Sequence, residues 1–240
     1  MNPVELLTFP DELALARAAA EAWLEKIAEA HLHGLPHTVA LAGGRAARSL
    51  FPAVAEGSRA RAISLSTVHF FWGDERCVPP NDPESNFASA RHLLLQPLGI
   101  AGEKIHRIAG EKSSDTAARE AVAELRRIAP PGANGMPVLD LVFLGMGEDG
   151  HVASLFPEES AAMLSAPEIY RPVIATKPPP HRITLGYGPL AAAREVWVLV
   201  SGRDKTAALK KSLAPDGHTP LARLLRLRAH TRIFTDIPVS

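Results

Sequence analysis

The amino-acid sequence predicts an α/β fold: a mostly parallel, Rossmann-like sheet with helices on both faces. Short apolar runs of strand type alternate along the chain with longer segments whose apolar residues recur every three or four positions. The run LDLVFLG at 139–145 is apolar throughout, as expected for a strand covered on both faces. Strands and helices that alternate in this way are typical of parallel sheets.

The first half of the chain is predicted to form two strands and three helices. In the first helix, apolar residues from Leu13 to Ala30 recur at helical spacing, and Asp11 stands where an N-cap belongs. The second strand is followed by a long loop that begins with GDER, residues 73–76. The predicted elements are helices at 11–31, about 46–55 and around 87–94, and strands at 38–42 and 68–72.

The second half is predicted to continue this alternation. Its predicted elements are helices at 116–129 and 204–213, a helical segment VASLFP at 152–157, and strands at 139–145, 182–188, 196–201 and 232–236. Clusters of proline and glycine at 78–83, 130–137 and 178–180 are interpreted as loops. We therefore predict a single domain over residues 1–240.

Composition and charge exclude several classes of protein. Hydrophobic residues make up 46% of the 240 residues and charged residues 22%, which is ordinary for a folded globular chain. Lysine plus arginine and aspartate plus glutamate both total 26, so no charge excess favours nucleic acid or an anionic membrane surface. Any anion must therefore be bound by a few well-placed cations.

The remaining bulk features predict a soluble, cytoplasmic protein. Cys77 is the only cysteine, which rules out an intrachain disulfide and fits a reducing compartment. The N-terminal sequence lacks the pattern of a signal peptide, and the apolar runs are far shorter than the roughly 20 residues that cross a bilayer. No coiled-coil pattern or apolar surface stripe stands out in the sequence, so we expect a monomer.

Four segments rich in glycine and charge directly follow predicted strands: AGGRAA, GDER, GMGEDGH and SGRDK. The carboxyl ends of parallel strands meet at one edge of the sheet, where ligands bind in such folds. Any one of these segments is compatible with an ordinary soluble loop. Four of them at one edge predict a ligand site.

The first of these segments, Gly43-Gly44-Arg45, is a candidate anion site. Two glycines between a strand and a helix let the backbone approach a ligand closely, and the helix N-terminus then offers N–H groups. A tight turn that needs glycine explains the pair equally well. The segment is neither a Walker loop nor a GxGxxG motif, so nucleotide binding is not indicated.

The GDER segment places two carboxylates and a guanidinium directly after a buried strand. Arg76 can grip a phosphate with two parallel hydrogen bonds. Asp74 and Glu75 can hold this arginine or bind sugar hydroxyls. The alternative is a surface ion pair within a loop.

The segment Gly145 to His151 contains a candidate general base. The imidazole of His151 can exchange a proton near neutral pH, and Asp149 can orient the ring or bind substrate. The glycines, Gly147 among them, indicate an unusual backbone path close to a ligand. A lone histidine is more often structural, but a glycine-rich loop at a strand end makes a functional role more plausible.

Two further cations, Arg182 and Lys205, flank predicted strands. Each alone is most simply a solvated surface charge, and each gains significance only if it converges with Arg76. The sequence has no cysteine pair, HExxH motif or close histidine pair, so we predict no metal site. It also lacks the GxSxG elbow of many serine hydrolases.

In this order, the segments resemble the 6-phosphogluconolactonase family. The matching stretches are LAGG (41–44), FFWGDERCVPPNDPESNF (70–87), DLVFLGMGEDGHVASLFP (140–157), PPHRITLGYGPLAAAREVWVLVSGRDKTAAL (179–209) and FTD (234–236). The second and third stretches are specific, whereas the GG pair and FTD are not. The resemblance implies a fold similar to glucosamine-6-phosphate deaminases and hydrolysis of 6-phosphoglucono-δ-lactone in the oxidative pentose phosphate pathway, without metal or organic cofactor.

The resemblance also implies roles for four side chains. The histidine of the DGH motif, here His151, activates water. Arg76, Arg182 and Lys205 are associated with the phosphate of the substrate. On this basis, His151 removes a proton from water that attacks the lactone carbonyl, and backbone N–H groups of the glycine loop are candidates to stabilise the oxyanion.

The first loop departs from the family pattern. The family usually has SGG followed by Ser or Thr residues and Pro, whereas this chain has Ala42 before the glycines and Arg45, Ala46 and Ala47 after them. Hydroxyl groups are lost and a guanidinium is added. We hypothesise that activity survives with altered affinity for the substrate. A different phosphorylated lactone is the alternative substrate that this departure allows.

Two rival functions remain at this point. A glucosamine-6-phosphate deaminase shares the GxDGH stretch but usually continues with IAFNEP, whereas this chain continues with VASLFP. A non-catalytic sugar-phosphate sensor is favoured only by the altered first loop. Release of ammonia from glucosamine 6-phosphate, or binding of 6-phosphogluconate without turnover, would identify the one or the other.

Overall fold

The main sheet of the computed structural model contains six parallel strands in the order β1-β9-β8-β5-β2-β3. Residues 4–132, 135–159 and 167–238 are described. The strands are β1 (Val4–Thr8), β2 (His37–Leu41), β3 (Val68–Trp72), β5 (Leu141–Gly145), β8 (Glu195–Val200) and β9 (Thr231–Thr235). The predicted α/β fold with a mostly parallel sheet is confirmed.

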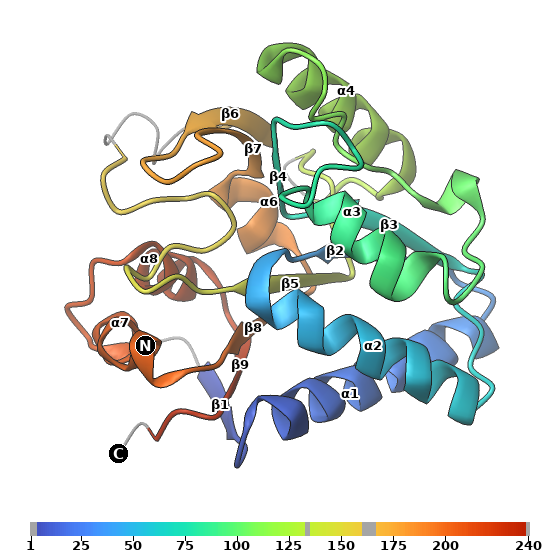
Figure 1. Cartoon of the computed structure of the whole chain (residues 1–240), viewed down its shortest axis with the longest axis horizontal. Coiled ribbons are helices and arrows are strands. Elements are labelled where there is room, and N and C mark those ends of the chain that lie inside the picture. Colours follow the sequence, from blue (N-terminus) through green and yellow to red (C-terminus); the bar gives the residue numbers. More distant parts are fainter. Residues whose placement is uncertain (1–3, 133–134, 160–166, 239–240) are drawn as a thin grey trace.

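Helices follow most of these strands along the chain (Figure 1). They are α1 (Glu12–Leu32), α2 (Gly44–Ala60), α3 (Asn86–Ala90), α4 (Ser114–Ile128), α6 (Tyr187–Ala192), α7 (Thr206–Leu213) and α8 (Pro220–Leu227). Strand β2 is buried at all five positions, as expected when helices cover both faces of the sheet. None of the helices in the described ranges is both long and apolar enough to cross a membrane.

An aromatic cluster packs the centre of the sheet against α1. Trp23 of α1 contacts Phe143 of β5 edge to face at 5.0 Å between ring centroids, and Phe143 contacts Trp197 of β8 in the same way at 5.6 Å. Trp197 lies 5.3 Å from Phe234 of β9. All four side chains are almost completely buried, so these aromatic contacts join α1 to three neighbouring strands.

The strand order reverses between β2 and β5, and this reversal positions the site. From β2 the chain moves outward to β3, and from β5 it moves outward in the opposite direction to β8 and β9. β2 and β5 pair at only two positions, Val39 with Leu141 and Ala40 with Val142, whereas β2 and β3 pair at five. The two strands therefore separate towards their carboxyl ends, which is where ligands bind in such folds.

A second, antiparallel sheet lies beside this edge, in the order β4-β7-β6. Its strands are β4 (Asp74–Arg76), β7 (His181–Leu185) and β6 (Tyr170–Ile174). The expectation of a loop at GDER was wrong, and the strand predicted at 182–188 pairs here and not in the parallel sheet. The chain leaves the main sheet at Gly73, whose N–H still donates to the carbonyl of Leu41 and whose carbonyl accepts from Leu185 N.

The predicted helical segment at 152–157 is not a helix. Val152 forms bridges with Met146 and Leu155. The N–H of Ser154 donates to Thr184 Oγ1 at 3.1 Å, and its hydroxyl donates to Asp74 Oδ2 at 2.6 Å. Both the backbone N–H and the hydroxyl of Ser154 are thus bound to the second sheet, and these tertiary hydrogen bonds override the local helix propensity.

Besides β4, the elements missed from the sequence include β1, β6, α6 and α8. α6 begins at Tyr187, inside the strand predicted at 182–188. β1 is a half-buried edge strand with a weak apolar pattern. β6 contains Pro172, which lowers strand propensity. α8 is short and begins at Pro220 behind a side-chain cap from Thr219. Each is stabilised mainly by its neighbours, which a single sequence does not reveal.

The N-cap of α1 provides a test of the helix assignment. Asp11 Oδ1 accepts a hydrogen bond from Ala14 N at 2.8 Å, as predicted, whereas Ser113 at the same position of α4 makes no such bond. We expect Asp11→Ala to lower the free energy of unfolding by about 1 kcal/mol, and Ser113→Ala to lower it by clearly less. Urea unfolding followed by circular dichroism measures both, and equal losses would contradict the assignment.

Candidate active site

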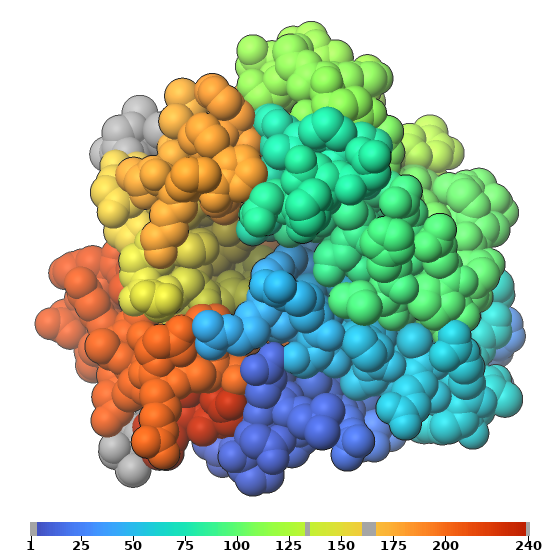
Figure 2. Space-filling model, in the orientation of Figure 1, coloured from blue at the N-terminus to red at the C-terminus, as the bar shows by residue number. Residues whose placement is uncertain are grey.

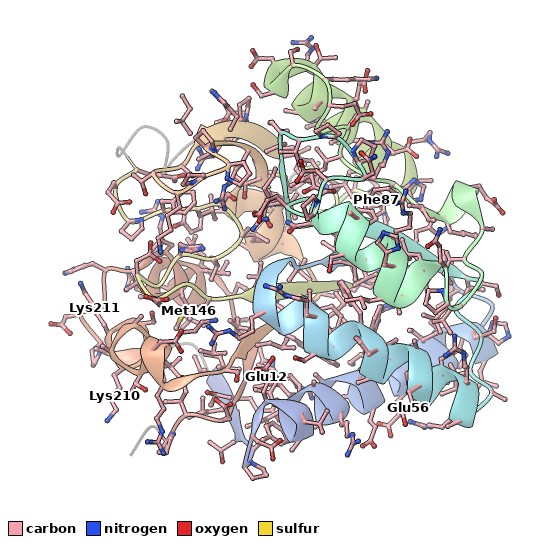
Figure 3. The ribbon with its side chains drawn as sticks, viewed as in Figure 1. Glu12, Glu56, Phe87, Met146, Lys210 and Lys211 are labelled. Atoms are coloured by element: carbon pink, nitrogen blue, oxygen red, sulfur yellow. The ribbon has the colours of Figure 1, made fainter. Side chains whose placement is uncertain are left out.

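A cavity of about 310 Å³ opens where β2 and β5 separate. Figure 2 shows the hollow between segments near residue 45 (light blue), residue 80 (teal), residue 150 (yellow) and residue 180 (orange), and Figure 3 labels Met146 at the end of β5. All four segments singled out in the sequence contribute to its lining. The lining residues are 42–46, Arg48, Gly73, Asp74, Arg76, Asn86, 143–148, His151, Ala153, Lys177, Arg182, Asp204 and Lys205.

His151 and Asp149 form a hydrogen-bonded pair at this cavity. Nδ1 of His151 lies 2.6 Å from Asp149 Oδ1, and the backbone N–H of His151 donates to the same oxygen at 3.1 Å. Burial raises the pKa of Asp149, but these two bonds and the nearby imidazole outweigh it and leave the pKa below its usual value. An ionised carboxylate only accepts hydrogen bonds, so Nδ1 carries a proton, and in the neutral imidazole Nε2 is the nitrogen that can accept one.

Gly147 makes room for this pair. A Cβ at this position would lie 2.1 Å from both Nδ1 and Cε1 of His151, and 2.7 Å from Asp149 Oδ1. The N–H of Gly147 donates to the carbonyl of His151 at 2.9 Å. This N–H is therefore occupied, and the expectation that the glycine loop supplies oxyanion donors is wrong for Gly147.

The first loop presents the N-terminus of α2 to the cavity. Gly43 is the N-cap and offers no side-chain hydrogen bond, and the first turn has no acidic residue. A Cβ on Gly43 would lie 1.9 Å from Asn86 Oδ1, and Gly44 has a φ of +74°. Both glycines are thus required by the structure, and the first turn of α2 lines the cavity, as an anion site at a helix N-terminus requires.

Asp74 and Glu75 are bound within the protein and do not hold the guanidinium of Arg76. Asp74 accepts from Ser154 and from Asn86 Nδ2. Burial raises the pKa of Glu75, although hydrogen bonds from the backbone N–H groups of Phe87, Asn86 and Arg76 oppose the shift. Of the two roles considered for these carboxylates, holding the guanidinium of Arg76 is wrong, because the start of α3 uses Glu75 as its acceptor.

Arg76 and Arg182 lie directly opposite each other on β4 and β7. Arg76 donates to the carbonyl oxygen of Glu84 at 2.6 Å, with the Glu84 carboxylate 3.4 Å away. Arg182 donates to the carbonyls of Pro179 and Lys177. Burial, then the charge of Arg76, lowers the pKa of Arg182. Like charges opposite each other are unfavourable, so this pair favours a bound anion.

One ring connects Arg182 with His151. The guanidinium of Arg182 lies over Phe156 at 5.6 Å, and the ring of His151 lies 4.9 Å from the same ring. Phe156 is 8% exposed and belongs to the segment that was expected to be helical. The chain turns between Val152 and Leu155, and Ala153 has a φ of +50°. Phe156, just after this turn, contacts both side chains.

Arg45 and Lys205 lie on another side of the cavity. Arg45 pairs with Asp204, with Nη2 and Oδ2 3.2 Å apart. Lys205 ends the 3₁₀ turn η3 (Arg203–Lys205), and burial followed by the charge of Arg45 lowers its pKa. The four predicted cations, Arg45, Arg76, Arg182 and Lys205, therefore line one cavity. Arg76 and Arg182 are neighbours on paired strands, and among charged groups Arg45 has the largest effect on Lys205.

The sequence matches the family described as glucosamine-6-phosphate isomerases/6-phosphogluconolactonase over residues 10–233. The chain belongs to this family. The family predicted from the motifs is thereby confirmed.

Relatives of known structure or name agree with this family. The 6-phosphogluconolactonase of Streptomyces coelicolor is 38% identical over 224 residues, 89% of this chain and 84% of that protein. The structure of Trypanosoma brucei 6-phosphogluconolactonase is 26% identical, with a TM-score of 0.86 over 98% of this chain and 97% of that one. A monomeric glucosamine-6-phosphate deaminase, 16% identical, shares the fold with a TM-score of 0.81 over 96% of each chain.

Sequence reasoning missed several residues that line the cavity of this family member. Asn86 lies in the quoted PESNF stretch, but its contact with Gly43 links segments that are far apart in the sequence. Lys177 precedes the three prolines, and only the fold of the second sheet brings it to the cavity. Over the described residues, no three histidine, cysteine or acidic side chains cluster as a metal site would require.

The role of Gly147 can be tested directly. We expect Gly147→Ala to break the hydrogen bond between His151 and Asp149, because the new methyl group overlaps the imidazole. The ¹⁵N NMR shifts of the His151 ring report the loss of the hydrogen bond from Nδ1–H to Asp149. Gly102→Ala is the control, since a Cβ there meets nothing within 4 Å. An unchanged His151 spectrum in Gly147→Ala would refute the packing.

Proposed function

We propose that the protein hydrolyses 6-phospho-D-glucono-1,5-lactone to 6-phospho-D-gluconate, the lactone-opening step of the oxidative pentose phosphate pathway. The observation that carries this proposal is the His151–Asp149 pair, which lies in a cation-lined cavity of a member of this family. The named relatives support the same substrate. His151 is the general base.

In the proposed reaction, His151 acts through Nε2 while its Nδ1–H stays bonded to the carboxylate of Asp149. Nε2 of His151 removes a proton from water, and the oxygen of this water forms a bond to the lactone carbonyl carbon. The carbonyl becomes an oxyanion in a tetrahedral intermediate. The bond from this carbon to the ring oxygen then breaks, and the ring oxygen takes the proton from His151. Throughout the reaction, Asp149 accepts the hydrogen bond from Nδ1–H of His151 and stabilises the imidazolium.

The oxyanion needs donors other than Gly147. The first turn of α2, which lines the cavity, offers backbone N–H groups without a side-chain cap. Preorganised donors of this kind usually contribute most to the acceleration of acyl chemistry. The altered first loop keeps these backbone donors, because they do not depend on the lost hydroxyl groups.

The phosphate of the substrate is held by cations in this proposal. Arg76, Arg182 and Lys205 line the cavity and carry more positive charge than Glu84 offsets. Phosphate binds such groups through charge-assisted hydrogen bonds, most strongly when guanidinium groups present two donors in parallel. A neutral chain can therefore select a phosphorylated lactone with local charge alone.

The general base is tested with freshly prepared lactone and correction for its spontaneous opening. We expect His151→Ala to lower kcat by about 10²- to 10⁴-fold, the usual contribution of a general base. Asp149→Asn is expected to lower kcat less, because the imidazole remains but its orientation is lost. The control is His33→Ala, at the C-terminal end of α1. Wild-type activity that survives His151→Ala would exclude this mechanism, and ammonia release from glucosamine 6-phosphate would favour the deaminase.

The phosphate contact is tested by comparing the phosphorylated lactone with glucono-1,5-lactone. We expect Arg182→Ala to raise KM for the phosphorylated lactone roughly tenfold to hundredfold, the value of one charge-assisted hydrogen bond of about 1.5–3 kcal/mol. KM for the unphosphorylated lactone should change much less. Arg17→Ala, an exposed arginine of α1, is the control. Equal effects of Arg182→Ala on both lactones would place Arg182 away from the phosphate.

A further inference from the structure

The pair formed by Arg45 and Asp204 bridges the rim of the cavity. Nη2 lies 3.2 Å from Oδ2 and Nη1 3.4 Å from Oδ1, and Nη1 also donates to the carbonyl of Ser201 at 3.5 Å. Arg45 follows β2 and Asp204 follows β8. Because β5 lies between these strands in the sheet, the pair crosses over the carboxyl end of β5, where the His151 loop begins.

Gly202 is shaped to admit this pair. Its φ is +101°, which residues with a side chain rarely adopt. A Cβ there would lie 2.3 Å from Asp204 Oδ1 and 2.5 Å from Arg45 Nη1. The guanidinium of Arg45 and the carboxylate of Asp204 therefore occupy the space that a side chain at position 202 would fill. The turn thus has this conformation with the ion pair packed against it.

The other end of the same turn is held by the FTD motif near the C-terminus. Asp236 accepts from the hydroxyl of Ser201 at 2.6 Å and from the N–H of Gly202 at 3.0 Å. Lys205 N donates back to the carbonyl of Gly202 at 3.1 Å. Asp236 thus fixes Ser201 and Gly202 at the start of the 201–205 turn, and Arg45 fixes Asp204 near the end of this turn. Lys205 is the next residue after Asp204.

The charges of Arg45 and Lys205 are used differently. The hydrogen bond from Arg45 is the main reason that the pKa of Asp204 lies below its usual value, so the pair is ionised and the charge of Arg45 is offset. Lys205 lines the cavity and makes no ion pair or hydrogen bond through Nζ with the residues described here. The charges of Asp204, Glu12 and Glu148 act on Lys205 without a direct contact. Its ammonium group is therefore available to an anion that enters the cavity.

We propose that Arg45 is a positioning residue, which acts through Asp204 to hold the 201–205 turn so that Lys205 faces the phosphate of the substrate. This inference rests on the proposed function. It assigns to Arg45 and Asp204 the ordering of the phosphate site that the altered first loop cannot provide with hydroxyl groups. Both side chains are at least a third exposed, and exposed ion pairs add little to folding stability, so the effect falls on binding.

The test compares Arg45→Ala, Asp204→Asn and the double variant. Each single change is expected to raise KM for the phosphorylated lactone and Kd for 6-phosphogluconate about tenfold, with kcat nearly unchanged, because one charge-assisted contact from Lys205 is lost. The double variant should be no weaker than the worse single variant, since both changes break one pair. A direct phosphate ligand at position 45 predicts the opposite sign for Asp204→Asn, because the freed guanidinium would bind phosphate more tightly.

Controls separate this inference from the proposed function. Arg61→Ala removes an exposed guanidinium 3.9 Å from Glu25 at the far end of α2, and should leave KM and Kd unchanged. Kd for 6-phosphogluconate is measured by calorimetry, independently of turnover. A wild type that binds this ligand without opening the lactone would refute the proposed function and leave the test of the pair intact. Asp204→Asn with a lowered or unchanged Kd would overturn the positioning role.

Discussion

The burial of the central strands on both faces is the constraint on which the rest of the structure depends. Apolar side chains dominate both faces of β2, β5 and β8, and the polar residues His37, Thr38 and Glu195 stand at the amino ends of their strands. The polar groups of the site are therefore confined to the opposite, carboxyl ends. At the carboxyl ends, β2 and β5 separate after two paired positions. The loops that follow them therefore enclose a cavity, and the glycines in these loops let backbone, imidazole and amide groups approach closely.

The charge of the cavity depends on which charged side chains are already engaged in hydrogen bonds within the protein. The carboxylates of Asp74 and Glu75 are saturated by hydroxyl, amide and backbone donors that build the start of α3 and the segment after His151. Arg182 is bound only to carbonyl oxygens in the described structure, and Lys205 has no carboxylate partner there. A chain with no net charge thus keeps a locally cationic cavity, which is the electrostatic requirement for a phosphorylated ligand.

The second sheet gives this arrangement its geometry. β4 and β7 place Arg76 opposite Arg182, and Phe156 packs under both Arg182 and His151. The base and the cations are thereby fixed relative to each other by packing and by backbone pairing. Preorganisation of this kind lowers the cost of orienting a substrate, because the groups do not have to be ordered when it binds.

The sequence by itself determined the fold class, the family and the segments that build the site. These are carried by local patterns: continuous apolar strands, helical spacing, glycines at strand ends and the DGH and GDER motifs. Tertiary structure alone decided which groups inside these segments are free. Ser154 is drawn from a helix-like segment to Asp74, Glu75 is used by α3, and Arg45 is bound to Asp204, 159 positions away. Such partners are set by the order of strands in the sheet, because hydrogen bonds between distant segments leave no periodicity in either one.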